Sequence, residues 1–229
     1  MIKAIKLKPL VAVVLVVVAC FVLSVSLVAN AKPSHNYSTP YTIVIDAGHG
    51  GIDGGCVGVG TGKDENYLNL EYALCLSDIM EKYNLNIVLT RTNLNGLYGQ
   101  FSENKKIDDM QKRKQIAIDC KADIVISLHM NSFPLQSCRG AQVFYKENNQ
   151  PSQKLAECVQ SVFVKTLPEA RESALVGDYY MLNEFEIPSV IVECGYLSNP
   201  EEEQLLLSEE YKKLVCSSIF IGVLKFLAN

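Results

Sequence analysis

The stretch YTIVIDAGHGGIDGG, residues 41–55, is the most informative part of the chain because it joins a buried strand to a loop rich in glycine. Its β-branched run, TIVID, predicts a strand that ends at Asp46. His49, one of three histidines in the chain, follows between glycines, where the backbone can approach a bound group closely. An ordinary turn residue is the alternative interpretation of His49. The stretch therefore points to a functional group at the carboxyl end of a buried strand.

Strand and helix patterns alternate along the rest of the chain. Further strands are predicted at residues 85–90, 122–129, 141–146 and 189–194. Helices are predicted at residues 66–83, 107–121, 153–167 and 208–227. Asn199, followed by Pro200, predicts the N-terminus of another helix. This alternation predicts an α/β fold, with a single domain and a mainly parallel sheet flanked by helices on both faces.

The composition fits one globular domain and argues against binding to nucleic acid. The chain has 229 residues, of which 48% are hydrophobic and 20% are charged, so it can bury a full core. Its net charge is −4, and removing the three positive charges of Lys3, Lys6 and Lys8 leaves −7 for the remainder. A domain that is so acidic is a poor candidate for binding a phosphate backbone.

The N-terminus has the features of an export signal. Three lysines precede an apolar run from Leu10 to Val28, and the small residues of the segment ANA, residues 29–31, follow it. The run is long for a cleaved signal and just long enough to span a bilayer. We therefore expect residues 1–31 to be a signal peptide or a membrane anchor, and residues 32–40 to be a polar linker. Under both alternatives the rest of the chain is exported.

The cysteines do not follow a disulfide pattern. Seven of the eight come after the signal segment, which is an odd number, and none forms a CxxC pair. Cys75 and Cys216 lie in helical apolar patterns that are typical of core thiols. Cys56 and Cys194 lie close to the motifs described next and could compete for a metal.

Three predicted strands lead to a side chain capable of chemistry. His49 follows the first strand, His129 ends the strand at residues 122–129, and Glu193 ends the run SVIVE. In open α/β sheets, ligands bind beyond the carboxyl ends of the strands. Together with Glu65, just before the first helix, the two histidines match a catalytic zinc site that keeps a fourth position open for water.

These residues also have interpretations that involve no ligand. His129 could be a hydrogen-bonded histidine at a strand end, and Glu65 could be an acid that stabilises a helix N-terminus. Asp64 and Glu71 are neighbouring alternatives to Glu65, although Glu71 falls inside the predicted helix. Glu193 follows four apolar residues, where a buried carboxylate is costly unless it serves a site.

Three further polar residues are candidates for supporting roles. Asp46, three residues before His49, could orient a metal ligand from outside the coordination sphere, or it could be structural. Arg91 and Arg113 could bind substrate carboxylates through paired hydrogen bonds, with exposed salt bridges as the alternative.

Four ordered motifs span most of residues 42–207, namely IVIDAGHGGIDGG, KDENYLNL, ADIVISLHMNS and IPSVIVECGYLSNPEEEQLL. Together they resemble the zinc-dependent N-acetylmuramoyl-L-alanine amidases, which trim bacterial peptidoglycan. The resemblance implies that His49, Glu65 and His129 hold one Zn²⁺ ion and that Glu193 is the catalytic carboxylate. It also implies one catalytic domain over residues 41–229, with a mixed, mainly parallel sheet.

The resemblance implies hydrolysis of the amide bond between N-acetylmuramic acid and L-alanine. No wall-binding repeat is recognisable, and a short member with an N-terminal signal resembles the branch that acts on the spore cortex. The expected partners are peptidoglycan, the membrane through the N-terminal segment, and a lipoprotein or a dimer partner. The expected location is outside the cytoplasm, in the cell wall or in the intermembrane space of a forming spore.

Two other functions stay open on the sequence alone. One is a zinc peptidase that cuts a different bond of the wall. The other is a cell-wall binding protein that is catalytically weak or depends on a partner. The products distinguish these functions, because an amidase releases an intact peptide with L-alanine at a free N-terminus.

Overall fold

In the computed structural model, which describes residues 40–228, β1 at Thr42–Ala47 lies inside a six-stranded sheet. The strand order is β2-β1-β3-β6-β4-β5. The other strands are β2 at Asn86–Leu89, β3 at Ile124–Asn131, β4 at Gln142–Tyr145, β5 at Leu175–Val176 and β6 at Ser189–Tyr196. β1 is parallel to β2 and β3, and β6 is parallel to β3, whereas β4 is antiparallel to β6. The prediction of a mixed, mainly parallel sheet is confirmed.

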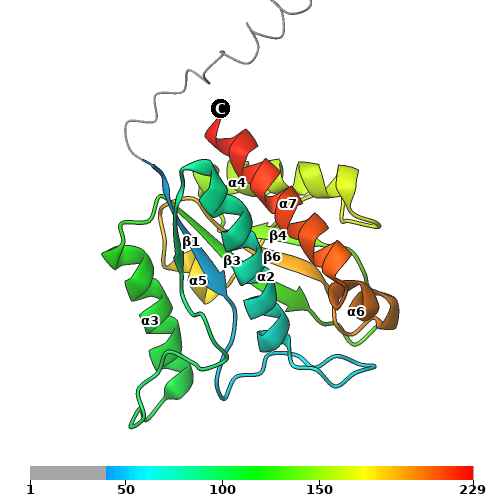
Figure 1. Ribbon diagram of the computed structural model, residues 1–229, viewed down its shortest axis with the longest axis horizontal. Helices are drawn as coiled ribbons and strands as arrows, with labels where there is room; N and C mark the ends of the chain where they lie inside the picture. Colours follow the sequence, from blue (N-terminus) through cyan, green and yellow to red (C-terminus); the bar gives the residue numbers. More distant parts are fainter. Residues whose placement is uncertain (1–39, 229) are drawn as a thin grey trace, which may run out of the picture. The chain divides into compact units, whose positions relative to one another are not determined.

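Helices cover both faces of this sheet, as predicted (Figure 1). On one face lie α2 at Glu65–Met80, α4 at Gln150–Thr166 and α7 at Glu209–Leu227. On the other face lie α3 at Lys105–Asp119 and the short α5 at Tyr180–Asn183. A 3-10 turn at Glu81–Tyr83 extends α2, and α6 at Pro200–Leu206 follows β6.

The larger core lies between the sheet and the layer of α2, α4 and α7. β1 directs Ile43 and Ile45 into this core, and it directs Val44 into the smaller core under α3 and α5. Burial on both faces explains why TIVID is a continuous apolar run rather than an alternating one. The polar side chains of this segment therefore come where the strand ends, and this is what positions the site.

Some helix boundaries depend on local hydrogen bonds that cannot be predicted from the spacing of apolar residues. α4 begins at Gln150, before its predicted start at residue 153, because the Asn149 side chain accepts a hydrogen bond from the Ser152 N–H at 2.9 Å. Pro151 fits the first turn, where its missing N–H costs nothing. The pattern does not predict α5 and β5, because elements of four and two residues are too short to show a period.

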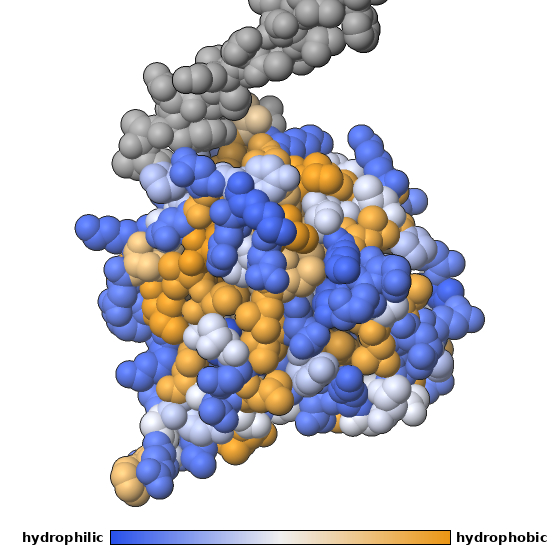
Figure 2. Space-filling view, in the orientation of Figure 1, coloured by the Kyte–Doolittle hydropathy of each residue, from blue (hydrophilic) through white to orange (hydrophobic). Residues whose placement is uncertain are grey.

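α7 buries only part of its apolar side chains. Phe220 and Val223 are buried, whereas Leu214, Ile221 and Leu224 are exposed. This face of the molecule consequently carries apolar side chains among charged ones (Figure 2).

The prediction for residues 1–31, a signal peptide or a membrane anchor, lies outside the described residues, as does nearly all of the predicted linker. Within residues 40–228, none of the helices has both the length and the apolar content needed to cross a membrane.

The N-terminus of α6 gives a direct test of helix capping. Asn199 accepts hydrogen bonds from the N–H groups of Glu201 and Glu202 at 2.9 and 3.0 Å, as predicted, and it donates one to the Gln136 carbonyl oxygen. We expect Asn199→Ala to lower the free energy of unfolding by about 1–2 kcal/mol in urea denaturation. Asn199→Asp keeps the acceptor and should recover most of the loss. An aspartate variant as unstable as the alanine variant would show that the Gln136 contact dominates instead.

Candidate active site

The carboxyl ends of β1, β3 and β6 bring three predicted site residues to one edge of the sheet. His129 of β3 lies opposite Glu193 of β6 in the parallel register. His49 lies just beyond β1, and its ring centroid is 4.9 Å from that of His129. Glu65 enters from the side as the first residue of α2 and is only 3% exposed. Four segments that are far apart in the sequence thus contribute to one site.

Within residues 40–228, His49, Glu65 and His129 form a group of side chains suited to holding a metal ion. Each offers one ligand atom, and the three atoms lie within 4.8 Å of one another. Glu65 Oε1 is 3.3 Å from His49 Nε2 and 3.0 Å from His129 Nδ1. Two imidazoles and one carboxylate are a donor set of catalytic zinc sites, which keep a further position open. The donors present therefore fit the metal that the sequence predicts.

The charges of this group favour a bound cation. Burial by itself would raise the pKa of Glu65, but contacts with His129 and His49 hold it well below its usual value. Burial would likewise lower the pKa of His49, but the carboxylates of Glu65 and Asp53 raise it to about 9. The carboxylates thus draw positive charge to the site, and a metal cation competes with protons for the same ring nitrogens.

Glycines permit two close approaches in this site. A Cβ atom on Gly48 would lie 2.3 Å from the His129 ring, and one on Gly55 would lie 2.4 Å from Glu65 Oε2. His49 itself has a left-handed backbone with a φ of 60°, which is uncommon for a residue with a side chain. The surrounding glycines are therefore part of the construction of the site, because larger residues would displace the candidate ligands.

Asp53 is a candidate functional residue that the sequence analysis missed. Its Oδ2 atom is 3.0 Å from His49 Nδ1, so that Nε2 of the same ring faces Glu65. Carboxylates commonly orient metal-binding histidines in this way. The only signal in the sequence is the spacing of four residues from His49, and it becomes meaningful through the pairing of Gly50 with Asp53 that closes the loop.

Glu193 is buried at the end of β6, with 7% of its surface exposed. Its Oε2 atom has no hydrogen-bond partner within residues 40–228. Burial raises the pKa of Glu193 to about 7, since the opposing effect of His129 is smaller and the charge of Glu65 adds to the rise. A carboxyl group with this pKa can accept and release a proton near neutral pH.

Asp46 and Arg113 form a buried ion pair beneath the His49 loop. Arg113 Nη1 is 2.6 Å from Asp46 Oδ1, and the same guanidinium donates to the carbonyl oxygens of Ala47 and His49. Burial by itself would raise the pKa of Asp46, but Arg113 and a hydrogen bond from Ser127 are foremost among the contacts that lower it to about 2. Asp46 is therefore connected to His49 through Arg113 and the His49 carbonyl oxygen, rather than through the His49 ring.

Arg91 and Arg113 lie beneath the His49 loop, and Arg113 is also among the residues that line the pocket described below. They are 4% and 1% exposed, and their donors bond to the protein itself. Arg91 donates to the carbonyl oxygens of Ala47, Gly48 and Asn66. The carbonyls of Ala47 and Gly48 need donors because the chain leaves the sheet after β1. Both arginines hold the His49 loop in place, and binding of a substrate carboxylate by either of them stays a prediction.

The alternative metal ligands do not join this group. Glu71 pairs with Lys212 at 2.9 Å, and Asp64 is exposed. Cys56 and Cys194 are free thiols, and neither belongs to the metal-binding group found within residues 40–228. The structure thus favours Glu65 among the acids considered as a third ligand.

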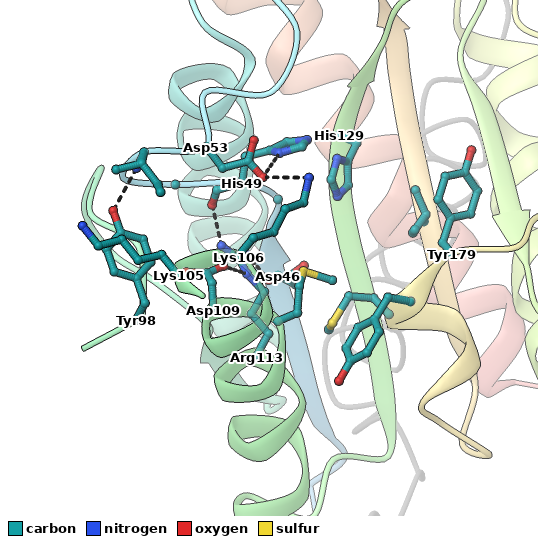
Figure 3. A pocket seen from close by; sticks show the side chains of 17 residues that line it. Asp46, His49, Asp53, Tyr98, Lys105, Lys106, Asp109, Arg113, His129 and Tyr179 are labelled. Atoms are coloured by element: carbon teal, nitrogen blue, oxygen red, sulfur yellow. Dashed lines mark hydrogen bonds and ion pairs between the residues drawn. The ribbon is translucent and has the colours of Figure 1, made fainter. Parts of the chain in front are cut away.

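A pocket lies beside the site, between α3 and α5 (Figure 3). His49 and His129 line its end at the sheet edge, Tyr98 and Lys106 line the α3 side, and Tyr179 lines the α5 side. The pocket can therefore hold part of a substrate directly beside the candidate metal ligands.

Comparison with known proteins shows similarity over almost all of the described chain. A family model described as N-acetylmuramoyl-L-alanine amidase matches residues 43–225. The germination-specific N-acetylmuramoyl-L-alanine amidase of Bacillus subtilis is 31% identical over 189 residues, which are 80% of this chain and 78% of that protein.

Solved structures show the same similarity. The CwlD amidase from Clostridioides difficile, solved in complex with the GerS lipoprotein, matches with a TM-score of 0.78 and 33% identity, covering 82% of this chain and 98% of that one. The catalytic domain of CwlV, an N-acetylmuramoyl-L-alanine amidase from Bacillus (Paenibacillus) polymyxa var. colistinus, matches with a TM-score of 0.73 and 28% identity, covering the same shares of the two chains.

The ion pair of Asp46 and Arg113 generates a prediction about stability. Asp46→Asn leaves Arg113 without one of its two carboxylates, so we expect the free energy of unfolding at pH 7 to fall by about 3 kcal/mol. The pKa of Asp46 is lower in the folded state, so its contribution is complete above the ordinary value of 3.8 and is lost as the pH falls toward 2. In urea unfolding, the gap between wild type and variant should narrow from pH 6 to pH 2.5. A gap that does not change with pH would contradict the assignment.

Proposed function

This chain belongs to the N-acetylmuramoyl-L-alanine amidase family, and we propose that it cleaves its substrate with one Zn²⁺ ion held by His49, Glu65 and His129. The amidase activity itself follows from the family match and from relatives that carry this activity in their names. One observation carries the proposal of a metal: three ligand atoms converge within 4.8 Å beside Glu193, whose buried Oε2 atom has no partner in the described chain.

The bond to be cut joins the lactyl carbonyl of N-acetylmuramic acid to the nitrogen of L-alanine. An amide is a poor electrophile, and its amine leaves poorly without a proton. When bound, zinc supplies Lewis-acid chemistry, since it polarises a carbonyl and makes water easier to deprotonate. The protein itself must supply the proton transfers.

Glu193 is the residue that we propose for these transfers. Its carboxylate takes a proton from the attacking water as the new C–O bond forms. The carboxylic acid then gives a proton to the L-alanine nitrogen as the C–N bond breaks. Its burial and its pKa of about 7 support both steps. Asp53 holds the His49 ring in orientation, and Arg91 and Arg113 hold the backbone of the loop.

We also propose that the chain acts on spore-cortex peptidoglycan, outside the cytoplasm. The support comes from the similarity to a germination-specific amidase and to CwlD. Because the CwlD structure includes a lipoprotein, we propose a lipoprotein or a second copy of the chain as a partner. Attachment to the membrane through residues 1–31 is the corresponding proposal for the N-terminal segment.

Two variants test the division of labour between metal and base. Glu193→Gln should keep stoichiometric zinc and lose at least about 100-fold in hydrolysis, because proton transfer fails. His129→Ala should lose both zinc and activity, whereas His35→Ala, in the predicted linker, should lose neither. Zinc analysis and mass spectrometry of the released peptides are the measurements. Full zinc in His129→Ala, or unchanged turnover in Glu193→Gln, would refute the respective role.

The same assay separates the alternative functions. A released peptide with L-alanine at a free N-terminus supports the amidase reaction. Cleavage elsewhere in the stem peptide would identify a zinc peptidase instead. A folded wild type that holds no zinc and releases no product would favour the partner-dependent alternative.

The cortex proposal predicts a phenotype confined to spores. Deleting the gene should remove cleavage of the N-acetylmuramoyl-L-alanine bond from cortex muropeptides and leave vegetative muropeptides unchanged. Chromatography of muropeptides from both cell types is the measurement. Altered vegetative muropeptides with a normal cortex would contradict the proposal.

A further inference from the structure

The two walls of the pocket beside the site differ in charge. Lys105 and Lys106, at the start of α3, line one wall together with Tyr98. Tyr179, Tyr180 and Met181 line the wall on the α5 side, and no charged residue from that segment lines the pocket. Figure 3 shows the same division, with the lysines near His49 and Tyr179 on the opposite side. Asp53, which pairs with Lys106, and Asp109 also line the pocket on the side of α3 and the His49 loop, so the charged groups of both signs lie on that side and the α5 side is uncharged.

Lys106 is placed close to the reacting centre. Its Nζ atom is 3.7 Å from Asp53 Oδ2, and the same oxygen is 3.0 Å from His49 Nδ1. The Lys106 side chain is 72% exposed, so its ammonium group remains open to a further partner. Because Asp53 shares its charge with His49, it does not neutralise Lys106 alone. An anion bound at Lys106 would therefore be connected to the candidate metal ligand His49 through Lys106 and Asp53.

Tyr98 supports the side of the pocket that carries Lys105 and Lys106. Its hydroxyl oxygen accepts a hydrogen bond from the Ile52 N–H at 2.9 Å, which ties the ring to the loop that carries His49. The Lys105 Nζ atom lies 5.4 Å from the centre of this ring, within the range of a cation–π contact.

The substrate has an asymmetry that matches these walls. In the bond to be cut, the lactyl carboxyl group of the sugar is consumed in the amide, so the glycan side carries no charge there. The stem peptide beyond L-alanine carries carboxylates. An extended peptide advances about 3.3–3.6 Å per residue, so a carboxylate on the second residue lies about 7 Å from the scissile bond. His49 Nδ1 and Lys106 Nζ contact the same Asp53 oxygen at 3.0 and 3.7 Å, so the two nitrogens lie no further apart than the sum of these distances, and Lys106 is within reach of such a carboxylate.

We propose that Lys106, assisted by Lys105, binds the α-carboxylate of the second stem-peptide residue and so directs the peptide along α3. This inference rests on the proposed function, because it assumes that the scissile amide lies at His49 and His129. Lys106 is a specificity residue in this scheme, since it contacts the substrate away from the reacting atoms.

The test compares two ligands that differ in one group. N-acetylmuramoyl-L-alanyl-D-glutamate carries the free α-carboxylate, and N-acetylmuramoyl-L-alanyl-D-isoglutamine carries an uncharged amide in its place. Binding is measured by calorimetry on the zinc-loaded, full-length Glu193→Gln protein, in which turnover is blocked. We expect the carboxylate ligand to bind about three- to tenfold more tightly, as for a partly exposed ion pair.

Adding Lys106→Ala should abolish this preference, because it should weaken the binding of the carboxylate ligand and leave the binding of the amide ligand unchanged. Adding Lys112→Ala should leave it intact, because Lys112 has the same charge on the same helix but is exposed and does not line the pocket. Equal binding of the two ligands by the Glu193→Gln protein that retains Lys106 would overturn the inference. A preference that survives the addition of Lys106→Ala would overturn it as well.

Hydrolysis by the wild type distinguishes this failure from that of the proposed function. A wild type that releases the dipeptide from both substrates, while its Glu193→Gln variant shows no carboxylate preference, overturns the role of Lys106 alone. A zinc-loaded wild type that cleaves neither substrate and binds neither ligand overturns both proposals together.

Discussion

The buried Glu65 carboxylate is the interaction on which the site depends. Its Oε1 atom accepts hydrogen bonds from the Met130 N–H and the Asn69 side chain, and it contacts the rings of His49 and His129. Its Oε2 atom accepts a hydrogen bond from the Cys56 N–H. Burying an ionised carboxylate is costly unless several donors or cations surround it. The helix, the strand and the loop meet at this one group, and their meeting creates a geometry suited to holding a metal ion.

A second layer of buried charge keeps the loop in place. Arg113 links Asp46 of β1 and Asp109 of α3 to the backbone of His49, so the loop is attached both to the sheet and to the helix that covers it. Arg91 satisfies the carbonyl oxygens of Ala47 and Gly48. Backbone carbonyls that leave a sheet need such donors. The unusual backbone of the loop thus has its support from side chains that lie beneath it.

The sequence predicted the fold class correctly, and it singled out four residues that the structure brings to one edge of the sheet, because apolar runs and strand-end polar residues are local signals. Contacts between distant segments left no such signal. Nothing local marks Arg113 as buried, since its burial arises from Asp46, 67 positions away. Asp53 was missed for the same reason, because only the folded loop turns its carboxylate toward the His49 ring. Short elements such as α5 contain too few residues to show a periodic pattern of apolar side chains.

The two helices that bound the pocket rest on the smaller of the two cores. Local opening in a protein starts where few apolar contacts are lost, so we expect α3 and α5 to open at a lower free energy than the helices over the larger core. A ligand that fills the pocket contacts both helices and stabilises the closed form by mass action. Ligand binding and local stability are consequently coupled, so slowed amide hydrogen exchange along α3 would report that the pocket is occupied, although the candidate site residues His129 and Glu193 lie on β3 and β6.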